Sequence, residues 1–224
     1  GLYAKTSTAL VFLFFITGAY IFYNTNILNQ YRTQEDIDAL GIEYETEYSQ
    51  YRELPMPKVT DVEIAVDLFP EQFRIEANST QILVNDTNQT INSVHLIFPV
   101  QSEVLDVKLG GAELKQINKR LAYYIFEFDE AMQPGEKRQL ISSVRVEQQG
   151  FSSNRADTRL VRNGTFIPNH ILVPQVGYSS SLQIKDRNKR IRYGLAETGR
   201  MPLLEDKSSH TKNMLRQDSD YIQL

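Results

Sequence analysis

Histidine is the side chain that most often supplies acid–base chemistry or a metal ligand near neutral pH. The chain contains three, His95, His170 and His210, which are widely separated, so none forms the H-x-x-x-H pair of a zinc site. His95 lies inside a segment of alternating polarity and is expected to be an ordinary sheet residue. Cysteine is absent, which excludes disulfides, thiolate metal sites and a cysteine nucleophile.

Short motifs for other chemistries are missing as well. The sequence has no G-x-S-x-G elbow, no G-x-x-x-x-G-K-[ST] phosphate loop and no G-x-G-x-x-G turn. Carboxylates are plentiful, but spacing alone does not single out a pair for acid–base work. We therefore predict no catalytic, cofactor-binding or metal-ligating residue in this chain.

The densest charged feature is the run from Lys185 to Arg192, with five basic residues and one acid. A contact with phosphate or anionic lipid is one interpretation, but a solvated helix or loop face is the usual explanation of so short a run. Over the whole chain, 24 Lys and Arg against 28 Asp and Glu give a net charge of −4. This charge has the wrong sign for general attraction to nucleic acid, so no nucleic-acid partner is expected.

Sequons of the form N-x-[ST] occur at four positions. They start at Asn78, Asn85, Asn88 and Asn163. The motif is frequent by chance and matters only in a glycosylating host, so glycosylation is a weaker interpretation.

The elements that would position any site begin with an apolar segment. No charged residue occurs from Thr6 to Tyr31, and residues 9–23 are almost wholly apolar. A hydrocarbon core of about 30 Å needs roughly 20 such residues, so residues 1–28 are predicted to be a transmembrane helix with short flanks. A cleaved signal peptide is the alternative, but no Ala-x-Ala site follows the segment. The chain starts at Gly1, and we interpret it as a piece of a longer protein.

An acidic helix is predicted within residues 29–57. Thr33 provides an N-cap, and Pro55 and Pro57 end the segment. One face carries residues spaced by three and four, namely Ile37, Leu40, Tyr44, Tyr48 and Tyr51, with most acidic residues off that stripe. An acidic helix is poorly placed against anionic lipid, so the stripe is expected to pack on the following domain, with a solvated spacer as the alternative.

From Lys58 the period changes to two, which predicts β-strands. A first hairpin turns at residues 70–72, and its second strand is expected to change phase at a bulge before Ile82. Further strands are predicted around residues 94–98, 105–109, 124–128 and 140–146, with turns at 110–111 and 134–135. No helical crossover of the needed length intervenes, so residues 58–224 are predicted to be an all-β antiparallel sandwich or saddle.

Regularity weakens beyond Gly150. Residues 159–166 are expected to form one more strand with a turn at 163–164, and residues 181–192 one helix. The last residues, 220–224, resemble the start of a strand, which indicates truncation before a further domain.

Several segments carry a family resemblance. Residues 51–70, YRELPMPKVTDVEIAVDLFP, resemble the opening strand of the N-terminal β-saddle domain of aminopeptidase N-like zinc metallopeptidases. Shorter pieces agree in order, namely 84–87 with 91–96, the turn at 133–136, residues 163–166 and residues 174–178. More narrowly, the order of span, acidic helix and saddle looks like bacterial proteins in which this module follows the last membrane helix of an ABC-type permease.

The resemblance implies chemistry that lies outside this chain. In that family an H-E-x-x-H helix and a downstream Glu hold zinc, and a G-x-M-E-N strand binds the substrate amino terminus; neither motif occurs here. The zinc is therefore expected in a domain beyond Leu224, with no cofactor in this fragment. The implied partners are the lipid bilayer, that downstream catalytic domain, ABC transporter subunits and the peptide substrate of the parent protein.

The function predicted from these observations is a membrane anchor with a non-catalytic accessory domain of a zinc aminopeptidase-like membrane protein. One alternative is a stand-alone binding or adhesion ectodomain that acts through loops such as 85–90 or 152–158. Another is a catalytically dead peptidase-like module of a transporter. The expected location is the plasma or inner membrane with the β-domain extracytoplasmic, although Lys5 and Arg32 on the two sides leave the orientation open from charge alone.

Overall fold

The computed structural model describes residues 1–29, 31–100, 102–151, 159–197, 205 and 207. Its helices are α1 (Leu2–Phe22), α2 (Gln34–Tyr48) and α3 (Arg187–Arg192), with a π-helical turn η1 (Tyr23–Leu28) and 3-10 turns η2 (Ser49–Tyr51), η3 (Pro70–Gln72), η4 (Asn169–Ile171) and η5 (Ser180–Leu182). Its strands are β1 (Lys58–Phe69), β2 (Arg74–Val84), β3 (Ile91–Ile97), β4 (Glu103–Leu109), β5 (Ala112–Asn118), β6 (Tyr123–Met132), β7 (Lys137–Glu147), β8 (Leu160–Val161), β9 (Gly164–Thr165) and β10 (Gln175–Val176).

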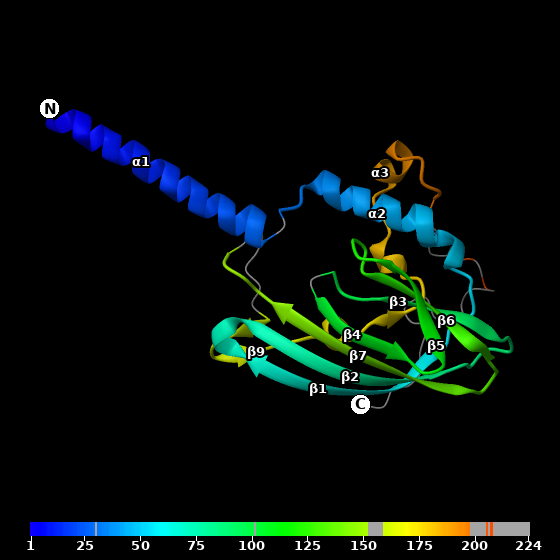
Figure 1. Cartoon of the computed structure of the whole chain (residues 1–224). Helices are drawn as coiled ribbons and strands as arrows, with labels where there is room; N and C mark the ends of the chain where they lie inside the picture. Colours follow the sequence, from blue (N-terminus) through cyan, green and yellow to red (C-terminus); the bar gives the residue numbers. More distant parts are fainter. Residues whose placement is uncertain (30, 101, 152–158, 198–204, 206, 208–224) are drawn as a thin grey trace.

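The strands form two four-stranded sheets and one small hairpin. The larger sheet has the order β1-β2-β7-β4, the smaller has the order β10-β3-β6-β5, and β8 pairs with β9. The strand pairs are antiparallel. The predicted all-β sandwich, preceded by an apolar helix and a short second helix, is confirmed (Figure 1).

The main core lies between the two sheets and is built from alternating strand positions. Its fully buried members include Ile75, Ala77, Leu83, Val94, Leu96, Phe98, Phe126, Met132, Leu140 and Val144. Burial of an aliphatic or aromatic side chain stabilises a fold by about 1.5–3 kcal/mol, so these contacts hold the two layers together.

The predicted phase change in β2 is wrong. The strand pairs with β7 without a register shift from Arg74 to Val84, and its buried positions continue as Ser79, Gln81 and Leu83. Polar residues thus occupy inward positions, and Ser79 is accommodated there because its hydroxyl hydrogen-bonds the Ser142 hydroxyl at 2.7 Å. A register shift lies instead in β1, between Val59 and Asp61.

Other departures from the predictions also follow from local backbone geometry. A register shift between Val104 and Asp106 leaves Leu105, the first apolar residue of the predicted strand 105–109, 43 % exposed. Strand β5 follows directly on the predicted turn at 110–111, where Gly111 has a φ of 70°. This edge strand was missed because most of its side chains are exposed and no apolar alternation marks it.

Asn85 is a structural residue rather than an accessible sequon. It is fully buried, and its side-chain amide donates to the carbonyl oxygens of Met132 at 3.0 Å and Gln89 at 2.8 Å. Its Oδ1 accepts from the Thr87 amide at 3.0 Å. The sequon at this position therefore closes the loop between β2 and β3.

Helix α2 forms a third layer on the outer face of the smaller sheet. Tyr44 and Tyr48 are 1 % and 2 % exposed and pack with Ile97 of β3 and with Tyr123 and Ile125 of β6. The prediction that the tyrosine stripe packs on the following domain is confirmed, and the solvated-spacer alternative is wrong. The first member of the stripe, Ile37, departs from the prediction, since it is 51 % exposed.

The C-terminal part of the described chain is more broken than predicted. Residues 159–166 form the β8–β9 hairpin, which agrees with a strand interrupted by a turn. The single helix expected at 181–192 is instead η5 followed by the short α3, which Asp186 caps by accepting from the Lys189 amide at 2.8 Å. The expected strand at 220–224 and the loop at 152–158 lie outside the described residues.

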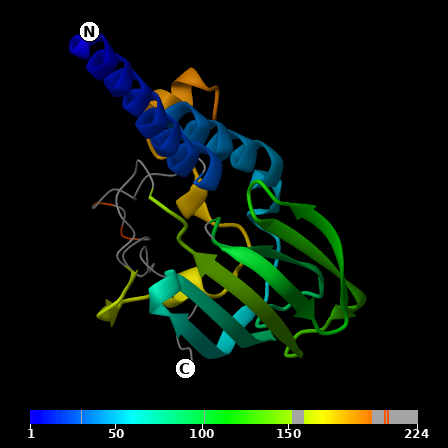
Figure 2. The same ribbon diagram turned by 60° about the vertical axis from the view of Figure 1, so that its left-hand side comes forward.

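Helix α1 extends away from the sandwich (Figures 1 and 2). The stretch Tyr3–Leu28 has a mean hydropathy of 1.6 and is long and apolar enough, by length and composition, to cross a membrane. Its large apolar side chains from Leu10 to Phe22 are 47–73 % exposed. The helix predicted within residues 1–28 thus corresponds to α1, and its helical conformation continues through η1.

Candidate functional site

The described histidines do not form a reactive site. His95 is 2 % exposed at the centre of β3, where its Nδ1 lies 2.8 Å from the hydroxyl of Tyr123. Burial lowers the pKa of His95 to about 4, so the ring is neutral at pH 7. His170 lies exposed on η4, and His210 lies outside the described residues. His95 is therefore a buried sheet residue, as predicted.

The residues around His95 form an aromatic cluster that joins α2 to the smaller sheet. The rings of Tyr48 and Tyr123 stack with centroids 3.8 Å apart, and those of Tyr44 and Tyr178 stack at 5.0 Å. Tyr51 lies edge-on to His95 at 4.5 Å. Burial raises the pKa of Tyr44 and of Tyr123, so their hydroxyls stay protonated. The cluster is a packing interface and not acid–base machinery.

Glu45 of α2 holds the segment that contains α3. Glu45 and Arg190 form a buried bidentate pair, in which Nη1 and Nη2 of the guanidinium each lie 2.8 Å from a carboxylate oxygen. Arg190 also donates to the carbonyl oxygens of Ile184 at 2.6 Å and Ala196 at 2.8 Å. Glu45 accepts in turn from the Ile184 amide at 2.8 Å. This pair fastens residues 184–196 to α2.

A second ion pair lies about two helical turns before the first on α2. The Lys189 ammonium lies 2.7 Å from a carboxylate oxygen of Asp38, which also accepts from Tyr193 at 3.3 Å and Gln34 at 2.9 Å. The hydrogen bond from Lys189, followed by that from Gln34, lowers the pKa of Asp38. The interpretation of run 185–192 as a solvated face is therefore wrong for Lys189 and Arg190. Both are paired with acidic residues that were expected to lie off the buried face of α2.

The end of the apolar helix is fastened to the sandwich by polar contacts. The Asn29 side-chain amide donates to the carbonyl oxygens of Gln149 at 2.7 Å and Phe151 at 3.1 Å. The ring of Phe151 lies 5.9 Å from that of Tyr20 on α1. Between these contacts Gly150 has a φ of 58°, and a Cβ at this position would overlap Oδ1 of the buried Asn24. We call these contacts the junction.

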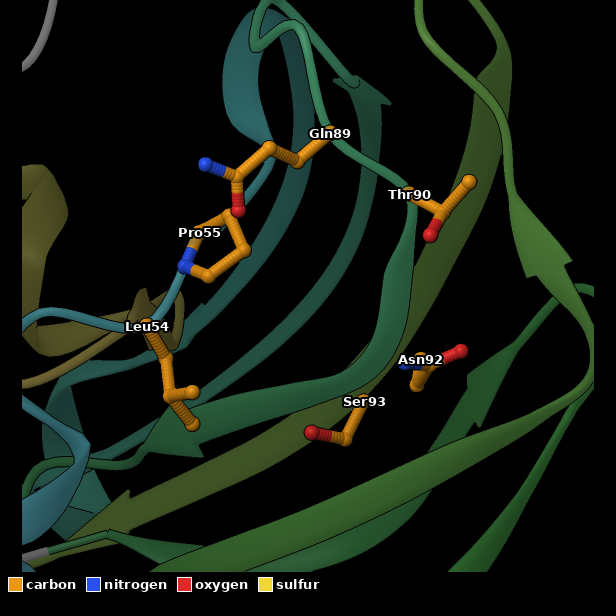
Figure 3. A pocket seen from close by; sticks show the side chains of 6 residues that line it. All are labelled: Leu54, Pro55, Gln89, Thr90, Asn92 and Ser93. Atoms are coloured by element: carbon orange, nitrogen blue, oxygen red, sulfur yellow. The ribbon is translucent and has the colours of Figure 1, made fainter.

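A separate pocket of about 550 Å³ lies between the segment after η2 and the start of β3 (Figure 3). It is lined by Leu54, Pro55, Gln89, Thr90, Asn92 and Ser93. None of these six side chains titrates near neutral pH, so the pocket offers hydrogen bonds and apolar contact but no general acid or base. Of the predicted binding loop 85–90, only Gln89 and Thr90 line this pocket.

Metal binding finds no support in the geometry. Among the residues that the structure describes, no group of three or more His, Cys, Asp or Glu side chains could hold a metal ion. The zinc that the family resemblance implies is expected beyond Leu224, outside this chain, so no chemical step is assigned to the described residues.

Comparison with known proteins identifies weak structural neighbours. An M1 zinc metallopeptidase from Deinococcus radiodurans aligns with 12% identity and a TM-score of 0.33 over 41% of this chain and 20% of its own. A mutant of that enzyme bound to a Tyr-Ser-Ala substrate aligns with 11% identity and a TM-score of 0.34 over 44% and 22%. A yeast LTA4 hydrolase in complex with bestatin aligns with 17% identity and a TM-score of 0.29 over 40% and 14%.

These neighbours are much longer than the region they share with this chain. The alignment spans about a fifth of the Deinococcus enzyme and less of the yeast enzyme. No protein-family model and no curated protein matches the sequence. The zinc and the ligands named for the neighbours belong to those proteins.

Proposed function

We propose that the chain is a membrane anchor joined to a non-catalytic accessory domain of a zinc aminopeptidase-like membrane protein. Anchoring is supported by helix α1. Its apolar side chains are exposed along the helix, while its C-terminal end is fastened to a folded sandwich. The peptidase part of the proposal is supported by the sequence resemblance of residues 51–70 to the saddle domain of that family.

Anchoring follows from the cost of leaving α1 in water. Phe12, Phe14 and Phe15 alone are 68 %, 73 % and 66 % exposed. Transfer of one such side chain to an apolar environment is favourable by about 1.5–3 kcal/mol, so a bilayer would stabilise the helix strongly. Backbone groups of a helix are satisfied internally, which makes this segment compatible with hydrocarbon.

The accessory role rests on how the anchor is attached. The junction and the α2 layer connect the exit of α1 to the sandwich through packed and hydrogen-bonded groups rather than through a flexible linker. A domain that followed the sandwich would then be kept close to the bilayer. In this proposal the downstream domain holds zinc and cleaves peptides, ABC transporter subunits are membrane partners, and the sandwich lies outside the cytoplasm.

The peptidase part is tested on the intact protein. Translation of the gene past Leu224 is expected to reach an H-E-x-x-H motif, and the purified full-length protein is expected to contain zinc and release amino-terminal residues from aminoacyl substrates. A stop codon directly after Leu224 would overturn this part of the proposal. Full-length protein with neither zinc nor turnover would overturn the enzymatic role and support the catalytically dead transporter module.

The anchoring part is tested by fractionation and topology. The full chain is expected to stay in membranes after alkaline carbonate extraction, whereas a variant without residues 1–28 is expected to be released. Protease added to spheroplasts should digest the sandwich. Release of the full chain by carbonate would refute anchoring, and complete protection in intact spheroplasts would refute the proposed orientation.

A further inference from the structure

The depth of the anchor in a bilayer can be worked out from its charges. Lys5 is the last charged residue before the apolar stretch, and about 20 helical residues at 1.5 Å each cross a hydrocarbon core of about 30 Å. Counted from Thr6, such a span ends at Thr25. Residues from Asn26 onward then enter the headgroup layer, which is about 5–8 Å thick.

A pocket of about 330 Å³ begins at Asn26, the residue that follows the span in this count. It is lined by Asn26, Tyr31, Arg32, Asp36, Leu40 and Arg120. These residues come from η1, the connection to α2, the first turns of α2 and the turn between β5 and β6. The volume lies at the lower end of ligand pockets, which begin at about 300 Å³.

The pocket carries charges of both signs, and two of them, Asp36 and Arg120, are held by hydrogen bonds and an ion pair. Thr33 donates to Oδ2 of Asp36 through its amide and its hydroxyl, at 2.8 Å each. These two hydrogen bonds are the main cause of the lowered pKa of Asp36, and the nearby charges of Arg120 and Arg32 add to it. Arg120 is held beside α2 by an ion pair of 2.9 Å with Glu43.

The charge pattern matches one class of headgroup. Guanidinium groups bind phosphate oxygens well, and a carboxylate with about four acceptor sites keeps capacity for an ammonium donor after two hydrogen bonds. Asp38 and Glu45 of this helix are neutralised by Lys189 and Arg190, but Glu35 adjoins Asp36 and Glu43 pairs with Arg120. Two arginines thus stand against three carboxylates near the pocket, which disfavours a headgroup with net negative charge. Ile27 and Tyr31, which are 62 % and 54 % exposed, suit the apolar edge of the same layer.

We propose that this pocket binds the phosphoethanolamine headgroup of a phospholipid in the leaflet around the end of α1, a role that rests on the proposed anchoring. Arg32 and Arg120 bind the phosphate, and Asp36 binds the ammonium group. The lipid would thereby fix the height of the sandwich above the membrane. No covalent step is involved.

The test uses the full chain in nanodiscs made of phosphatidylcholine with either phosphatidylethanolamine or phosphatidylglycerol, with retained lipid counted by native mass spectrometry. Phosphatidylethanolamine should be retained in preference to both other lipids. Arg120→Gln should reduce this retention about tenfold, the effect of losing one charge-assisted contact. Lys119→Gln removes the same charge from the same turn, outside the pocket lining, and should leave retention unchanged.

A second variant tests the pocket through Asp36 in case Arg120→Gln disturbs folding. Asp36→Asn should raise phosphatidylglycerol retention relative to phosphatidylethanolamine, whereas Glu35→Gln, an adjacent charge loss outside the pocket lining, should not. Equal retention of the two lipids, or equal behaviour of a pocket variant and its control, would overturn the proposal. So would equally tight binding of free phosphoethanolamine or inorganic phosphate in detergent. Failure of the chain to insert into nanodiscs would instead refute the anchoring itself.

Discussion

Removal of Arg190 is expected to undock the C-terminal segment from α2. The Arg190 and Glu45 side chains are each 6 % exposed and make two contacts of 2.8 Å. Arg190→Met leaves the Glu45 carboxylate buried without its cation, which costs about 3–5 kcal/mol for a pair of this kind. The loss should fall on residues 184–196, because Arg190 also holds the carbonyls of Ile184 and Ala196.

Amide hydrogen exchange on the full chain in detergent measures this effect segment by segment. Exchange in the stretch 184–196 should accelerate strongly in Arg190→Met, while strands β2 and β7 keep their protection. The double variant Glu45→Gln with Arg190→Met should lose less than the sum of the single variants, because no unpaired charge is then left buried.

The matched control is the neighbouring pair Arg187 and Glu197. Both side chains are 67 % exposed and lie 3.4 Å apart, so Arg187→Gln should cost no more than about 1 kcal/mol. If Arg190→Met changed exchange no more than Arg187→Gln does, the reasoning from burial would be refuted. Uniform loss of protection across both sheets would show that the segment is not a separate unit.

Three further predictions concern the sandwich and the junction. The pKa of His95 is about 4 in the folded chain and 6.5 in a free side chain, so the unfolded chain binds more protons between these pH values. The neutral ring therefore contributes about 3 kcal/mol of stability, which is fully present above pH 6.5 and should be lost as the pH falls to about 4. Denaturant titrations at several pH values should show a weaker fall in His95→Gln, and an identical fall would contradict the assignment. Gly150→Ala should destabilise the junction by about 1–3 kcal/mol through its positive φ and the overlap with Asn24, seen as faster exchange in η1. Ser79→Ala should cost about 1–3 kcal/mol in thermal unfolding by orphaning the Ser142 hydroxyl, and the double alanine variant should recover part of that loss.

The regular elements were predictable because their signals are local. The Thr33 cap forms the predicted N-terminus of α2, with Asp36 completing a capping box. The turns at Pro70, Gly111 and Gly135 separate strands where the sequence places them. The buried positions of β2 were not predictable beyond Ala77, because Ser79 and Gln81 are polar and only the partner strand β7 makes an inward hydroxyl acceptable.

The candidate sites were less predictable because they join distant parts of the chain. Asn29 of the junction meets residues about 120 positions later, and Arg120 reaches the pocket beside Asp36 from another element. No spacing rule connects such residues, since their approach depends on how α2 lies on the smaller sheet. The basic run at 185–192 was assigned to solvent for the same reason.

The sequence by itself determined the apolar helix, the acidic helix and the alternation of the strands, since each depends on the types and spacing of neighbouring residues. Only the tertiary structure decided which polar groups are buried and with what partners. Glu45 and Arg190 are 145 positions apart and carry full charges that sequence patterns assign to the surface. They are buried because the fold supplies each charge with the other, and that pairing exists only when the chain is folded.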